Sequence, residues 1–259
     1  MFDWIVLLLA VLPAILLVVY IYRKDKFEKE PFGMLLKAFF FGCLTTIPAS
    51  LLEGVLQTVY AALLGNGGGL LGYSLYTGFV VAGFSEELFK LLFLAWAVWR
   101  SRHFTEYFDG IVYAASVSLG FACVENILYV FGGTTYSEMI HTGIVRAVLS
   151  VPAHFLFGVT MGYFFSMAKF EPAKRGQNLR KALFVPLALH GTFDALIFMY
   201  SELLNDVPVV GVALMVGFFA FDVWMWRFCV RKLRYMQMKS EVQYWEKNSF
   251  DETENGETL

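Results

Sequence analysis

The chain has 259 residues, of which 58% are hydrophobic and only 16% are charged, with a formal net charge of −2. A soluble domain is roughly 45–50% apolar and about 25% charged. Together with a mean hydropathy of +0.59, this composition excludes an ordinary soluble domain, because the chain has too little polar surface to cover itself in water.

Seven apolar stretches are long enough to cross a bilayer, which takes about 20 mostly apolar residues. They cover residues 2–22, 36–60, 74–98, 109–131, 146–168, 182–202 and 209–228. In the first stretch the positive charges follow the apolar run and no cleavage site is evident, so we interpret it as a retained span and not a signal peptide. The second is ragged, and a re-entrant segment within it remains open. The sequence therefore predicts an all-α, polytopic transmembrane helix bundle of about seven spans, with the lipid bilayer as its surroundings.

The basic residues predict the orientation of this bundle. If seven spans alternate, every lysine and arginine except Lys37, Lys90 and Arg146 falls on one side. The positive-inside rule then places the N-terminus outside and the C-terminus in the cytoplasm. We divide the chain into a transmembrane domain over residues 1–234, with core motifs at 74–202, and a polar cytoplasmic tail over 235–259 that we expect to be disordered. The basic loops reflect topology, and we expect no nucleic-acid partner.

Ionisable residues inside the third span form the first unusual motif, Glu86-Glu87-Leu88-Phe89-Lys90. Glu86 and Lys90 are four positions apart and lie on one helix face. Glu87 points about 100° away, so the two carboxylates can serve different purposes. A structural ion pair would explain Glu86 and Lys90, but it would not explain Glu87.

Three further spans carry polar residues of the same kind. Glu125 and Asn126 follow a stretch rich in small residues, and interhelical hydrogen bonding is the simplest interpretation. His154 follows a proline in the fifth span, where a structural role is equally open. His190 and Asp194 have the spacing of a metal-ligand pair, of a histidine oriented by a carboxylate, or of a purely structural pair.

Charged residues nearer the span ends are cheaper to accommodate, and we interpret them as structural. Asp109 and Asp222 lie near the inner ends, where we expect them to pair with arginines of the same level. We expect Glu53 to be structural or solvated.

The depth of the mid-span residues unites them. At a rise of 1.5 Å per residue they fall in one layer between the midplane and the outer face. A charge at this depth costs several kcal/mol, and unrelated structural residues have no reason to share a layer. A desolvated glutamate can act as general base, and histidines can bind a metal or donate to an oxyanion. This set supports amide hydrolysis, although an ion- or proton-coupled transporter also places ionisable residues at mid-membrane.

The order of these motifs resembles the PrsW family of intramembrane proteases, distant relatives of the CAAX prenyl-protease and bacteriocin-processing (CPBP) proteins. The resemblance covers about residues 30–200 and is carried by EExxK at Glu86, FxxxEN at Phe121, His154, and HxxxD at His190. It implies cleavage of a membrane-anchored substrate in a bacterial inner membrane. In characterised members the substrate is an anti-sigma factor cut on its extracytoplasmic side. The CPBP pattern has a histidine where this chain has Glu125, and a CPBP-type prenyl endopeptidase is the alternative activity.

The resemblance also implies roles for individual residues. The catalytic set is Glu86, Glu87, Glu125, His154 and His190, and the supporting set is Lys90, Asn126 and Asp194. Family members are often named metalloproteases, which implies a divalent metal such as zinc on His154, His190 and Asp194. A water activated by glutamate without metal, as argued for the CPBP relatives, is the other possibility.

Overall fold

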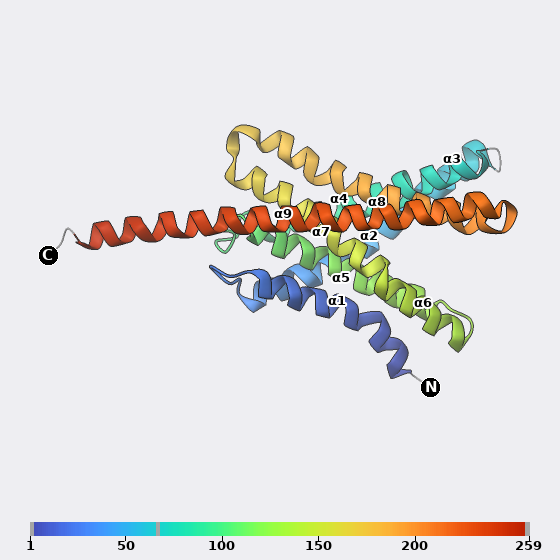
Figure 1. Ribbon diagram of the computed structural model, residues 1–259, viewed down its shortest axis with the longest axis horizontal. Coiled ribbons are helices and arrows are strands. Elements are labelled where there is room, and N and C mark those ends of the chain that lie inside the picture. The colour runs from blue at the N-terminus through green and yellow to red at the C-terminus, as the bar shows by residue number, and fades with distance from the viewer. Residues whose placement is uncertain (1–2, 66–67, 257–259) are drawn as a thin grey trace.

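The computed structural model describes residues 3–65 and 68–256, which form helices and short connections without any β-strand in those ranges. The helices in chain order (Figure 1) are α1 (Trp4–Lys24), α2 (Phe32–Leu64), α3 (Gly69–Leu75), the π-helix η1 (Tyr76–Phe84), α4 (Ser85–Val98), α5 (Asp109–Phe131), α6 (Tyr136–Val148), α7 (Ser150–Phe170), the 3-10 turn η2 (Pro172–Lys174), α8 (Arg175–Asp206) and α9 (Pro208–Gly256). The predicted all-α class is confirmed.

Six helical stretches in the described part of the chain are long and apolar enough to cross a membrane. The remaining predicted span, 74–98, corresponds to α3, η1 and α4, which follow one another directly but are each short. Figure 1 shows the α1–α2 and α7–α8 connections at the same end as the C-terminus, whereas α3 and the α8–α9 turn lie at the opposite end. The multi-pass bundle is thus confirmed, and its orientation in the membrane stays a prediction.

Two segments differ from the expectation. Much of the supposed outer loop before residue 146 is the helix α6, whose N-cap Thr135 accepts a hydrogen bond from the Glu138 amide at 3.2 Å. The tail expected to be disordered from residue 235 is helical as far as Gly256, because α9 continues past its apolar part. Residues 257–259 of that tail, and residue 2 of the first predicted span, lie outside the described residues.

Helix α5 lies at the centre of the bundle, and small residues let its neighbours approach closely. A Cβ atom added to Gly120 of α5 would collide with the backbone of Phe39 on α2, and one added to Gly158 of α7 would lie 2.9 Å from the Ala114 carbonyl oxygen. Close contact of this kind through small residues is typical of helices packed within a membrane. It fixes the helices that carry Glu125 and His154 against one another.

Candidate active site

The π-helix η1 leads directly into the paired glutamates of α4. Single π-helical turns are frequent at functional sites. A Cβ atom on Gly78 of η1 would lie 2.7 Å from the carbonyl oxygen of Gly191 and 2.9 Å from the amide nitrogen of Ala195, both on α8. Because the two backbones touch there, the start of α4 is held beside His190, which directly precedes Gly191.

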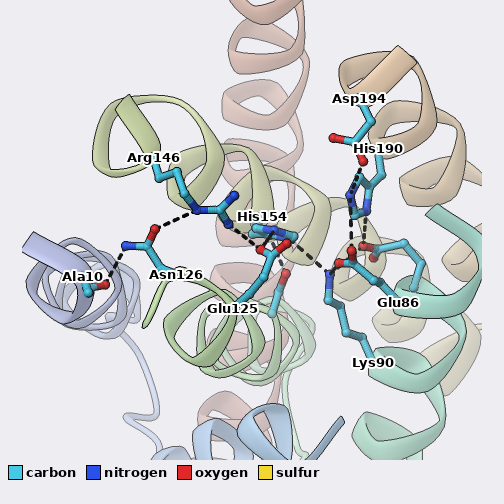
Figure 2. Close-up of polar contacts among 11 residues, drawn as sticks. Ala10, Glu86, Lys90, Glu125, Asn126, Arg146, His154, His190 and Asp194 are labelled. Atoms are coloured by element: carbon cyan, nitrogen blue, oxygen red, sulfur yellow. Dashed lines mark hydrogen bonds and ion pairs between the residues drawn. The ribbon is translucent and has the colours of Figure 1, made fainter. Parts of the chain in front are cut away.

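Lys90 is the centre of the buried network in Figure 2. Its Nζ donates to Glu86 Oε2 at 3.0 Å and to Glu87 Oε1 at 2.9 Å, and it lies 3.1 Å from His154 Nδ1. The ammonium also lies 4.1 Å from the centre of the Phe121 ring. Lys90 is completely buried. The expected Glu86–Lys90 pair is therefore present, and Lys90 binds both carboxylates instead of one.

The Nε2 atom of each of the two histidines lies close to a carboxylate oxygen. His154 Nε2 lies 2.9 Å from Glu125 Oε2, and His190 Nε2 lies 3.3 Å from Asp194 Oδ2. Their Nδ1 atoms face the α4 residues: that of His154 lies 3.1 Å from Lys90 Nζ, and that of His190 lies 3.0 Å from Glu87 Oε1. An imidazole whose second nitrogen is held by a carboxylate is the usual arrangement of metal-binding histidines. The structure thus joins all four motif-bearing segments in one cluster.

Arg146 of α6 is a member of the site that sequence reasoning missed. Its Nη2 donates to Glu125 Oε2 at 2.7 Å and its Nε donates to Asn126 Oδ1 at 2.9 Å. Asn126 in turn donates to the Ala10 carbonyl of α1 at 2.7 Å (Figure 2). The sequence did contain one indication of this role, because Arg146 is one of the three basic residues that do not fall on the predicted cytoplasmic side. The expectation of a loop at α6 concealed it.

A cavity of about 530 Å³ adjoins the cluster. The expected site residues that line it are Glu86, Glu125, His154, His190 and Asp194. Glu87 and Lys90 are absent from its lining and have no exposed surface. Glu53 of α2, which we expected to be structural or solvated, lines it as well. Of the two adjacent glutamates, Glu86 is therefore the one that a water molecule or a substrate can reach.

The chemistry of the donor groups fits a divalent metal. Glu86, Glu87, His154 and His190 each offer a ligand atom, and these atoms lie within 4.8 Å of one another. Glu87 Oε2 is buried without a hydrogen-bond partner, so one donor is still unused. Imidazole nitrogens and carboxylate oxygens are ligands that zinc accepts. Asp194, implied as a ligand, lies outside this group of four and contacts His190 instead.

Known proteins match most of the chain. The family described as "PrsW family intramembrane metalloprotease" matches residues 30–223. Protease PrsW of Clostridioides difficile (strain 630) is 39% identical over 196 residues, which are 74% of this chain and 79% of the relative. Protease PrsW of Bacillus subtilis (strain 168) is 37% identical over 223 residues, which are 86% of this chain and 91% of the relative. No solved structure matches the chain.

Proposed function

The chain belongs to the PrsW family of intramembrane metalloproteases, and we propose that it cuts a membrane-anchored protein of the anti-sigma-factor type on its extracytoplasmic side, in a bacterial inner membrane. The resemblance of the four motifs supports the substrate class. The position of the site within the bundle supports the side.

The observation that carries the proposed mechanism is that Glu86 lines the cavity whereas Glu87 does not. Lys90 donates to Glu86 Oε2 at 3.0 Å, and Glu86 Oε1 lies 3.9 Å from His190 Nε2, beyond hydrogen-bond distance, so Oε1 can accept a proton from water. The hydroxide oxygen bonds to the carbonyl carbon of the substrate, and the C–N bond then breaks. Glu86 returns the proton to the leaving amine, so that the carboxylate is regenerated.

The other members of the cluster hold these groups in place. Glu87 orients Lys90 and His190, because its Oε1 contacts both. Glu125 and Asp194 fix the rings of His154 and His190, which line the cavity. An imidazole N–H that turned from its carboxylate toward the substrate would stabilise the developing oxyanion.

A metal would be held by Glu86, Glu87, His154 and His190, and when bound it would supply Lewis acidity toward the carbonyl or the water. Lys90 contacts three of these four residues, so the ammonium and a metal ion share the same donors.

The cavity extends toward one end of the bundle. Its lining on α2 runs from Thr46 through Ser50 and Glu53 to Gln57, in the direction of the helix end at Leu64. In Figure 1, α3 lies at the end opposite the C-terminus. If the basic end of the bundle is cytoplasmic, as the positive-inside rule predicts, substrate enters from the extracytoplasmic half.

Purified protein in liposomes, incubated with a single-span substrate that has a tag at each end, tests this proposal. We expect one cut on the extracytoplasmic side of the substrate span, loss of cleavage with a zinc chelator, and recovery on adding zinc. A cut on the cytoplasmic side would contradict the proposed side and favour the CPBP-type activity. Full cleavage in chelator would contradict the metal assignment.

A further inference from the structure

A second group of buried acids lies far from the catalytic cluster. Asp25 follows the last residue of α1, Glu106 lies in the α4–α5 connection, and Asp109 begins α5. Their exposed fractions are 1%, 3% and 0%. Each offers a carboxylate oxygen, and the three oxygens lie within 4.8 Å of one another. Along α5, Asp109 is about 24 Å from Glu125 at the helical rise per residue, so this group is separate from the active site.

These acids are only partly satisfied by the protein. Asp25 Oδ2 accepts the Glu30 amide at 3.2 Å, and Asp109 Oδ2 accepts the amides of Thr105 and Glu106 at 2.8 and 2.7 Å. The other oxygen of each aspartate, and both oxygens of Glu106, are buried and have no hydrogen-bond partner of normal geometry, although the Ser240 hydroxyl lies close to Glu106 and the Glu30 carboxyl lies close to Asp109. An unpartnered carboxylate that is almost fully buried requires a proton or a cation.

Nearby cations do not neutralise the group. Within residues 3–65 and 68–256, no ion pair reaches Asp25, Glu106 or Asp109, and the arginine partners that we expected for Asp109 are absent. Lys247 pairs with Glu28 at 2.7 Å. Lys29 is exposed, lies 5.3 Å from the centre of the Tyr22 ring, and offsets the negative charge of Asp25 only in part.

A fourth acid, Glu30, lies beside Asp109, and the two carboxyl groups interact. Glu30 is buried and accepts a hydrogen bond from the Tyr113 hydroxyl.

The electrostatics agree with this shortage of positive charge. Burial raises the pKa of Asp25 to about 6 and the pKa of Glu106 to about 7, although the neighbouring Ser240 hydroxyl offsets part of the rise at Glu106. Burial likewise raises the pKa of Glu30 to about 7.

We propose that Asp25, Glu106 and Asp109 form a binding site for a hard divalent cation, Ca²⁺ or Mg²⁺. The donors are carboxylate oxygens without histidine or cysteine, which is the ligand set that these cations prefer. The catalytic group, with its two imidazoles, favours zinc instead. The two sites therefore differ in the metal that they select.

The site lies where three parts of the chain meet. The part of α9 after residue 235 rests on both loops that carry the acids. Ser240 accepts the Phe108 amide at 2.9 Å, Gln237 donates to the Lys24 carbonyl at 2.8 Å, and Gln243 donates to the Thr105 carbonyl at 2.8 Å. A bound cation would join the α1–α2 and α4–α5 connections beneath α9. Since these connections lead into α2, α4 and α5, it would stabilise the helices that carry the catalytic residues.

Thermal unfolding of the full-length protein, stripped with chelator and titrated separately with CaCl₂ and MgCl₂, tests the site. We expect at least one cation to raise the unfolding temperature by several degrees at up to millimolar concentration, the weak end of the range for protein sites. Glu106→Gln should weaken that binding at least tenfold, and Asp25→Asn should behave alike. Glu28→Gln, which removes a more exposed carboxylate paired with Lys247, should bind as the unchanged protein does.

The catalytic variant Glu86→Gln separates the two sites, because it should retain the Ca²⁺ or Mg²⁺ response. Calorimetric titration of the unchanged protein measures binding directly, should a variant fail to fold. The proposal is overturned if neither cation binds at millimolar concentration, in which case the acids are protonated. It is also overturned if Glu106→Gln and Asp25→Asn bind as strongly as Glu28→Gln.

Discussion

Replacing Lys90 with methionine removes an ammonium that holds two adjacent carboxylates together. Lys90 is completely buried and bonds Glu86 and Glu87 at 3.0 and 2.9 Å. Removing one partner of a buried ion pair costs about 3–5 kcal/mol, since the remaining charge is uncompensated. For a protein of this size 1 kcal/mol corresponds to about 2–4 °C, so we expect the unfolding temperature to fall by about 10 °C.

The Lys90→Met variant that still folds should also cleave its substrate much more slowly. Two buried carboxylates without a cation cannot both stay ionised, and protonated Glu86 cannot act as base, which costs roughly 100-fold or more in cleavage rate. Lys37→Met is the matched control, because Lys37 is an exposed lysine of α2 whose Nζ donates to the Ala97 carbonyl at 3.0 Å and lies 5.6 Å from the centre of the Phe41 ring, away from the catalytic carboxylates. Thermal unfolding in detergent and cleavage of a tethered substrate are measured for both. Equal unfolding temperatures, with activity kept in Lys90→Met, would refute the reasoning.

Three further outcomes follow from the structure. Arg146→Ala should lower cleavage at least tenfold, because Glu125 loses the donor at 2.7 Å that orients it; an unchanged rate would contradict this role. Gly78→Ala should destabilise the protein and reduce cleavage, whereas Gly72→Ala should be tolerated, since its Cβ would meet nothing within 4 Å; equal stability of the two would argue against close η1–α8 contact. With cations removed by chelator, the unfolding temperature should fall as pH rises from about 4 to 7. The pKa values of Asp25 and Glu106 are raised to about 6 and about 7 in the folded protein, so protonation of these carboxyls favours the folded state. An unfolding temperature that does not depend on pH would contradict this expectation.

The sequence alone predicted both the bundle and the cluster. Because burying a charge in a membrane is expensive, spans are apolar and an ionisable residue within a span is conspicuous. Long apolar stretches identified the spans, and the few ionisable residues inside them identified the cluster. Their shared depth, worked out from the helical rise, agrees with the contacts that join Lys90, His154 and His190. The spacing of His190 and Asp194 placed them on one helix face but left their role open, and the structure brings His190 Nε2 to 3.3 Å from Asp194 Oδ2.

What sequence reasoning could not supply depends on contacts between distant segments. Arg146 reaches Glu125 because α6 folds back from the end of α5, and hydropathy describes α6 as a loop. The sequence could not say which of Glu86 and Glu87 is the base. The structure distinguishes them, because Glu86 lines the cavity and Glu87 does not. The polar end of α9 is ordered through hydrogen bonds to loops more than a hundred residues earlier in the chain.

Cleavage by the Glu86→Gln variant is the most direct test of the mechanism. Glutamine keeps the shape of the side chain but cannot accept the proton of the attacking water. Purified Glu86→Gln in liposomes should still bind the tethered substrate but cleave it at least 100-fold more slowly, the smaller part of what a general base contributes. Glu202→Gln, at an exposed position on α8, should cleave normally. Cleavage by Glu86→Gln at the normal rate would contradict the assignment of Glu86 as the base.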